Sequence, residues 1–99
     1  MNESAFEAFL IKDEGIISKN KAVSSRMSKT RSVENEFGMS LDSIVQADIS
    51  MYQTLIAINQ RMSNGNGSYS NALRKYYIYK NGREFPRIRQ FESENKHLL

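Results

Sequence analysis

The stretch from Ser68 to Gly82 constrains the fold of this chain most strongly; it reads SYSNALRKYYIYKNG. Four apolar or aromatic side chains recur in it at helical spacing: Tyr69, Ala72, Leu73 and Tyr76. This spacing is typical of a helix that packs one face on a core. Ser68 is a suitable N-cap, and Gly82 fits the left-handed position that ends many helices. The stretch therefore predicts one amphipathic helix.

The second face of that helix is polar and carries no acid. It presents donors from four side chains: Ser70, Asn71, Arg74 and Lys75. Such donors suit phosphate oxygens or base edges, and backbone N–H groups at the Ser68 end could receive a phosphate as well. The alternative is a solvated helix face, which is the ordinary setting of an Arg-Lys pair.

Similar periodicity, interrupted by glycines and polar caps, predicts helices along the rest of the chain. We expect these elements: a helix from the cap Asn2 to Gly15, one from the cap Ser18 to Phe37 with Gly38 as its end, a helical turn in residues 39–47 with Ser43 and Gln46 at capping-box spacing, a helix of about residues 49–62 capped by Asp48, and a loop in residues 63–67. Ile16 and Ile17 are expected to be buried between the first two helices.

Each predicted helix has an inner stripe. The stripes are Phe6, Phe9 and Leu10, then Val23, Met27, Thr30, Val33 and Phe37, and then Tyr52, Leu55, Ile56 and Asn59. After Gly82, Phe85 is expected to fold back on the preceding helix and Pro86 to prevent its continuation. The prediction is an all-α orthogonal or irregular bundle of four to five helices in residues 1–84. Residues 85–99 are expected to be a linker or tail, in which a short helix is an option.

Composition restricts the kind of protein further. The 99 residues suit one domain and include no cysteine, which excludes disulfides and thiolate metal sites. No apolar run approaches the roughly 20 residues of a membrane span, and the N-terminus lacks a signal-peptide pattern. We expect a soluble, cytoplasmic protein with no membrane partner, no cofactor and no metal.

Charge is segregated along the chain, whose formal net charge is +3. The segments divide as follows: Lys19, Lys21, Arg26, Lys29 and Arg31 without an acid; then Glu34, Glu36, Asp42 and Asp48 without a base; then Arg74, Lys75, Lys80, Arg83, Arg87 and Arg89 against Glu84 alone. Two basic segments separated by an acidic one favour an anionic partner.

The helix of residues 18–37 carries a second polar face opposite its apolar stripe. Lys21, Ser25 and Lys29 belong to it, together with further serines, whereas Arg31 is rotated toward the opposite flank. We expect a DNA-binding surface formed by this face and by the polar face of residues 68–82. Its candidate residues are Lys21, Ser25, Lys29, Ser70, Asn71, Arg74 and Lys75. A merely soluble serine-rich surface remains the alternative for the first three.

For the other polar residues, we expect packing or surface charge rather than catalysis, base stacking or metal binding. Tyr76 lies on the core stripe and Tyr77 at its edge, so we expect packing rather than a nucleophile or a base-stacking platform; Tyr79 is expected to be partly exposed. His97 has no ligand partners at metal spacing. Paired acids at residues 13–14 and 34–36 fit caps and surface charge better than acid–base catalysis.

Four segments, taken in order, resemble the core-binding domain of tyrosine recombinases, the SAM-like helical domain at the front of phage-type integrases. They are FEAFLIKDEGIISKN, AVSSRMSKTRSVENEF, SLDSIVQADISMYQTLI and SYSNALRKYYIYKNG. The last is the best match, with its Ala-Leu-Arg, two aromatic residues and terminal Gly. The resemblance spans about residues 3–83 and implies a SAM-like orthogonal bundle. It also implies that the second and fourth helices contact DNA phosphates, and these are the two basic segments. A nucleoid-associated protein of bacterial or phage origin is a further implication of the resemblance.

The chain departs from the family after the helical bundle. The recombinase catalytic set includes arginines, a lysine, a His-x-x-Arg motif and a nucleophilic tyrosine in a second domain, whereas His97 is followed here only by two leucines. We therefore expect a non-enzymatic DNA-binding domain that contacts duplex DNA mainly through phosphates, either alone or beside a catalytic domain in a longer parent protein. The alternative is a SAM-like protein-interaction or self-association module, in which the acidic segment meets the basic surface of a second copy.

Overall fold

The computed structural model describes residues 1–13 and 21–99, and in these ranges no residue lies in a β-strand. The elements are α1 (Glu3–Asp13), α2 (Lys21–Phe37), α3 (Leu41–Val45), α4 (Asp48–Arg61), α5 (Ser68–Asn81), α6 (Ile88–Glu94) and a terminal 3₁₀ turn, Lys96–Leu98. The all-α prediction is confirmed. The predicted roles of Gly15, Ile16, Ile17 and Ser18 lie outside the described residues.

Several helix ends agree with the expectations from the sequence. The Asn2 side chain accepts a hydrogen bond from the Ala5 N–H at 3.1 Å, so it caps α1. Gly38 and Gly82 take φ values of +61° and +71° directly after α2 and α5. The Gly82 N–H donates to the carbonyl of Ile78 at 2.8 Å, a closure that glycine permits without strain.

Three predicted N-caps are wrong by one to three residues. Ser40, rather than Ser43, caps α3 by accepting from the Ser43 N–H at 3.2 Å. Asp48 is the first helical residue of α4, whose cap position is Ala47. Its carboxylate binds Tyr77 and Arg83 instead of the helix end. Ser68 is likewise the first residue of α5, after a glycine at φ +76°.

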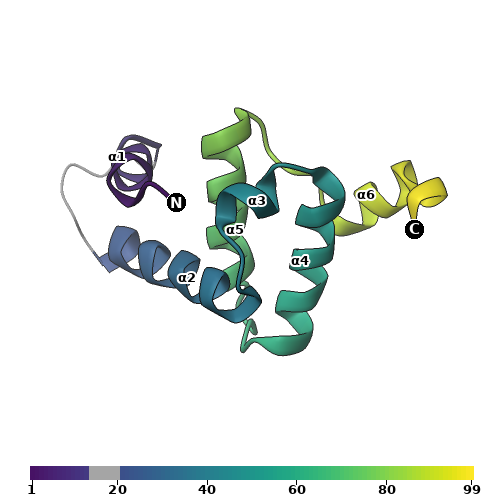
Figure 1. Cartoon of the computed structure of the whole chain (residues 1–99), viewed down its shortest axis with the longest axis horizontal. Coiled ribbons are helices and arrows are strands. Elements are labelled where there is room, and N and C mark those ends of the chain that lie inside the picture. The colour runs from purple at the N-terminus through teal and green to yellow at the C-terminus, as the bar shows by residue number, and fades with distance from the viewer. Residues whose placement is uncertain (14–20) are drawn as a thin grey trace.

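The helix α5 lies at the centre of the bundle. It contacts α1, α2, α3 and α4, and its contact with α2 is the most extensive in the fold. In Figure 1, α1 is seen almost end-on, α2 runs across the view, and α4 and α5 stand upright on either side of α3. The helices thus run in several directions, as expected for an orthogonal or irregular bundle.

Aromatic side chains gather on two sides of α5. Tyr76 and Tyr79 pack against Phe6, with ring centroids 4.9 Å and 5.5 Å away, and so attach α1. On the other side, the Tyr77 ring lies 5.2 Å from that of Phe85. Two neighbouring residues, Tyr76 and Tyr77, therefore connect α5 to opposite parts of the chain, and both are almost fully buried.

Most predicted stripe residues are buried, but the stripe of α4 is rotated from its expected position. Its buried residues are Met51, Thr54, Leu55 and Ile58, whereas Tyr52 and Ile56 are half-buried and Asn59 is exposed. Only Leu55 of the predicted set is fully inside. The aromatic Tyr52 turns instead toward α6, where its ring stacks on Phe91 at 5.0 Å.

The C-terminal segment, expected to be a linker or tail, is packed on the bundle. Phe85 folds back on α5 as predicted, and both Phe85 and Phe91 belong to the hydrophobic core, exposed by only 4% and 3%. The Tyr52 hydroxyl also donates to Glu92 at 2.6 Å. The expected division at residue 84 therefore does not describe the core, because two aromatic anchors lie beyond it.

We predict that Phe91→Ala lowers the free energy of unfolding by about 3–5 kcal/mol, since it empties a buried aromatic position. Leu98→Ala is the matched control. Its side chain is 57% exposed, so it should change stability by less than about 0.5 kcal/mol. Urea unfolding of the three proteins measures both effects. Equal, small effects would mean that α6 does not contribute to the core in solution.

Candidate functional site

The two basic helices lie side by side, as the charge pattern led us to expect. Arg26 Nη1 of α2 donates to the carbonyl of Asn71 in α5 across 3.5 Å. The Lys29 ammonium lies over the ring of Tyr69, 4.7 Å from its centroid. Because α2 and α5 are joined along this edge, donors from both helices reach one surface.

That surface contains a groove between α5 and the segment 83–95. Basic and amide side chains line one part of it: Arg26, Asn71, Arg74, Lys75 and Arg87. A second hollow adjoins it, shares Asn71, Arg74 and Arg87, and adds Asn66, Ser70 and Arg89. We call the surface formed by Arg26, Asn71, Arg74, Lys75, Arg87 and Arg89 the arginine groove.

Three carboxylates also line the groove, and two of them have partners. Asp48 accepts from Tyr77 at 2.6 Å and lies 3.3 Å from the guanidinium of Arg83. Glu94 accepts from Gln90 at 3.3 Å. Glu84 is exposed. Arg26, Arg74 and Arg87 line the same hollow as these carboxylates.

Arg74 is held in place by the chain that follows α5. Its Nη1 donates to the carbonyls of Phe85 and Pro86, at 2.9 Å and 3.2 Å. The guanidinium also faces the Phe85 ring, 5.8 Å from its centroid. Burial lowers the pKa of Arg74, and the positive charge of Arg87 lowers it further, against a smaller opposite effect of Glu84. The nearest charges therefore place Arg74 in a net positive field.

Lys75 has a structural role that the sequence did not reveal. Its ammonium forms an ion pair with Asp13 at the end of α1, and the two side chains are 26% and 31% exposed. The pair fastens α1 to the middle of α5. Lys75 lines the groove beside Arg74, but a partner that binds its ammonium must compete with Asp13 or share it.

Ser70 is engaged within the protein, and so is the backbone at the start of α5. The Ser70 hydroxyl donates to the carbonyl of Gly67 at 3.1 Å. The Asn64 side chain accepts from the N–H groups of Tyr69 and Ser70, and that of Asn66 accepts from the N–H of Ser68. A phosphate at this helix end would therefore have to displace Asn64 or Asn66 from these N–H groups.

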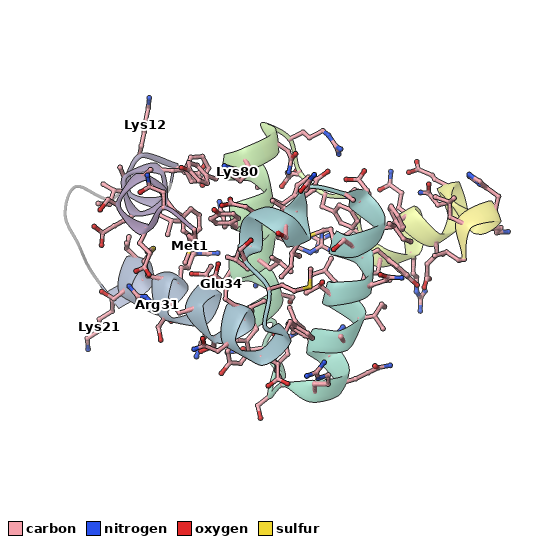
Figure 2. The ribbon with its side chains drawn as sticks, viewed as in Figure 1. Met1, Lys12, Lys21, Arg31, Glu34 and Lys80 are labelled. Atoms are coloured by element: carbon pink, nitrogen blue, oxygen red, sulfur yellow. The ribbon has the colours of Figure 1, made fainter. Side chains whose placement is uncertain are left out.

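The predicted residues of α2 lie outside the groove. Lys21 and Ser25 are exposed and line neither hollow, and Lys29 is half-buried against Tyr69. Figure 2 shows Lys21 extending from the start of α2 away from the bundle. Arg31 lies on the opposite flank, as expected, where it binds Glu3 of α1. Of the seven candidates, the structure brings Ser70, Asn71, Arg74 and Lys75 together and leaves the three of α2 apart.

The four acids of residues 32–60 are all engaged inside the chain. Glu34 accepts from the Leu41 N–H at 2.9 Å and lies 3.8 Å from the Met1 amino group, beside which Figure 2 shows it. Glu36 pairs with Arg61. Asp42 accepts from the Tyr76 hydroxyl, and Asp48 from that of Tyr77. The acidic segment thus provides no unpartnered acidic patch.

The tyrosines of α5 pack in the core as predicted. Burial and the hydrogen bonds to Asp42 and Asp48 raise the pKa of Tyr76 well above its ordinary value and that of Tyr77 to about 12. A phenol that is buried and held protonated is a poor nucleophile, and its ring is not available for stacking. Tyr79 is half-buried among aromatic rings.

The remaining polar groups offer no second site of a recognisable kind. His97 is exposed in the terminal turn. Within residues 1–13 and 21–99, no three His, Cys, Asp or Glu side chains come together in an arrangement that could hold a metal ion. None of the helices in these ranges combines the length and apolar character of a membrane span.

Comparison with protein-family models, with curated proteins and with solved structures finds no match to this chain. The resemblance to the core-binding domain therefore stays a prediction that rests on the four quoted segments.

Three arginines of the groove were not predicted from the sequence as site residues: Arg26, Arg87 and Arg89. Arg26 was hidden because it lies at the border of the apolar stripe of α2, where it reaches the carbonyl of Asn71. Arg87 and Arg89 lie in a segment interpreted as a tail. The excess of bases over Glu84 in residues 74–89 was the signal that could have identified them.

We predict that Tyr76→Phe lowers the free energy of unfolding at pH 7 by about 1–3 kcal/mol, because Asp42 loses a hydrogen bond to a charged acceptor. The Tyr76 hydroxyl is the main cause that lowers the pKa of Asp42 in the folded protein. This stabilisation is present above the unfolded pKa of an Asp, about 3.9, and is lost as the pH falls through the lower folded value.

The difference in the free energy of unfolding between Tyr76→Phe and the unchanged protein should accordingly shrink below about pH 4. Urea unfolding at a series of pH values measures it. Tyr79→Phe is the control, since no hydrogen bond of its hydroxyl is present in the described structure. A difference that stays constant down to about pH 2 would contradict the role assigned to Asp42.

Proposed function

We propose that this chain is a non-enzymatic helical domain that binds duplex DNA by holding its phosphate backbone along the arginine groove. The observation that carries the proposal is the distribution of ion pairs. Several cations of the bundle have carboxylate partners, whereas the arginines of the groove are gathered on one surface, and Arg87 and Arg89 have no ion pair among the described residues.

Five cationic side chains pair with carboxylates of the described residues, and two of them, Lys75 and Arg83, also line the groove. The ion pairs are Arg31–Glu3, Arg61–Glu36, Lys75–Asp13, Lys80–Asp42 and Arg83–Asp48. The groove, with Arg74, Arg87 and Arg89, is where an anionic polymer gains most from contact.

The side chains of the groove suit phosphates better than bases. Arginine presents several donors in a planar fork, which matches the oxygens of a phosphate group. Asn71 adds an exposed amide beside Arg74. Contacts of this kind position a protein on the duplex but carry little sequence information, so we propose binding with weak sequence preference.

Self-association through the acidic segment has less support. Glu34, Glu36, Asp42 and Asp48 each bind groups of their own chain, so a second copy would find no free acidic surface there. Concentration-dependent self-association without DNA binding, measured by sedimentation, would favour this alternative over ours.

We expect duplex DNA to bind with a strong dependence on salt. If about five phosphates are neutralised, the slope of log K against log salt is roughly −4 to −5. Fluorescence anisotropy with a short duplex at several salt concentrations measures the slope. No binding at low salt, or binding that salt does not weaken, would overturn the proposed function.

The double variant Arg87→Gln/Arg89→Gln should make the slope less steep by about 1.8, since two phosphate contacts are lost. The matched control is Lys12→Gln/Lys96→Gln, which removes the same charge from exposed positions that do not line the groove. Figure 2 shows Lys12 pointing away from the bundle. Equal effects of the two double variants would mean that net charge, and not the groove, governs binding.

A further inference from the structure

We infer that Arg74 and Arg87, with Asn71 beside them, form a discrete binding site for one phosphate group, and that its occupation ties the segment 85–94 to α5. The inference rests on the proposed function in naming a DNA phosphodiester as the occupant. It goes further by assigning one preformed site within the groove and a structural consequence of filling it.

Arg74 is preorganised for this task. The hydrogen bonds from Nη1 to the carbonyls of Phe85 and Pro86 fix the plane of the guanidinium. No described group accepts a hydrogen bond from its Nε or Nη2. Arg74 lines both hollows of the groove, and two such donors match two oxygens of one phosphate group. Little side-chain freedom remains to be lost on binding.

Arg87 is placed by the same contacts. It directly follows Pro86, whose carbonyl Arg74 holds, so its backbone is fixed close to the Arg74 guanidinium. Both arginines line both hollows. Among the charges near Arg74, that of Arg87 outweighs that of Glu84. Two like charges are thus kept close together without a bridging carboxylate, and an anion between them would relieve the repulsion.

A bound phosphate would bridge two parts of the fold. Arg74 belongs to α5, and Arg87 stands at the cap position of α6. In Figure 1, α6 lies at the far end of the molecule from α1 and joins the bundle next to α4. An anion that binds both arginines therefore stabilises the docking of α6, and the stability of the folded state rises with the logarithm of the anion concentration once this exceeds the dissociation constant.

Thermal unfolding in inorganic phosphate tests the site, with chloride at matched ionic strength as the reference. At several times its dissociation constant, phosphate should raise the Tm of the unchanged protein by roughly 4–8 °C. Arg87→Gln should lose this gain, while its Tm in chloride stays equal or rises because the repulsion is gone. Arg89→Gln should keep the gain, because this neighbouring exposed arginine is not among the charges that shift the pKa of Arg74.

Phosphate also stabilises proteins by general exclusion from their surface. A gain that is the same in the unchanged protein, Arg87→Gln and Arg89→Gln would be this general effect and would overturn the site. No gain at all would overturn it too, even if duplex DNA binds, because the binding would then be diffuse.

Titration with a short duplex tests the assigned occupant separately. If the DNA phosphodiester fills the site, Arg87→Gln should weaken duplex binding several-fold more than Arg89→Gln does, at the same salt concentration. A phosphate-dependent rise in Tm without any duplex binding would overturn the phosphodiester assignment and the proposed function, and would leave a site for another phosphate ester. The two failures are thereby distinguishable.

Discussion

The fold depends on two neighbouring tyrosines of α5 that donate to two aspartates. Tyr76 and Tyr77 are buried, and their hydroxyls reach Asp42 in the first turn of α3 and Asp48 at the start of α4. A buried phenol requires an acceptor, and an acid near a helix N-terminus is favoured by the helix dipole. These two bonds therefore satisfy both groups and set the positions of α3 and α4 on α5.

This arrangement determines the electrostatics of the surface. Because Asp42 and Asp48 serve the tyrosines and bind Lys80 and Arg83 as well, the acidic segment has little charge left for other partners. Arginines from α2, α5 and the segment 85–89 line the groove that these elements form: Arg26, Arg74, Arg87 and Arg89. A chain with the same net charge but without these internal contacts would present a mixed surface.

The sequence predicted the helices and the burial of the tyrosines because both depend on spacing. It predicted the site only in part, since spacing does not show which charges pair. Arg74 and Lys75 both fall on the polar face of the predicted helix. In the structure Lys75 binds Asp13, whereas Arg74 donates to two backbone carbonyls. The N-cap predictions were wrong for a similar reason. The Asn64 side chain accepts from the first N–H groups of α5, five and six residues further along the chain, and this spacing exceeds that of standard capping rules. The burial of Phe91 in the core could not be predicted, because α6 is too short and too polar to show an apolar stripe.

The segment after α5 matters most for how the site is understood. A solvated arginine loses much side-chain entropy when it holds a phosphate, and an isolated helix face offers only such arginines. Here Phe85 packs on Tyr77, which brings the carbonyls of Phe85 and Pro86 to Arg74 and places Arg87 beside it. One aromatic contact of the core thus positions both arginines. Core packing and the candidate phosphate site are therefore parts of one arrangement, and a change that loosens the first must also disorder the second.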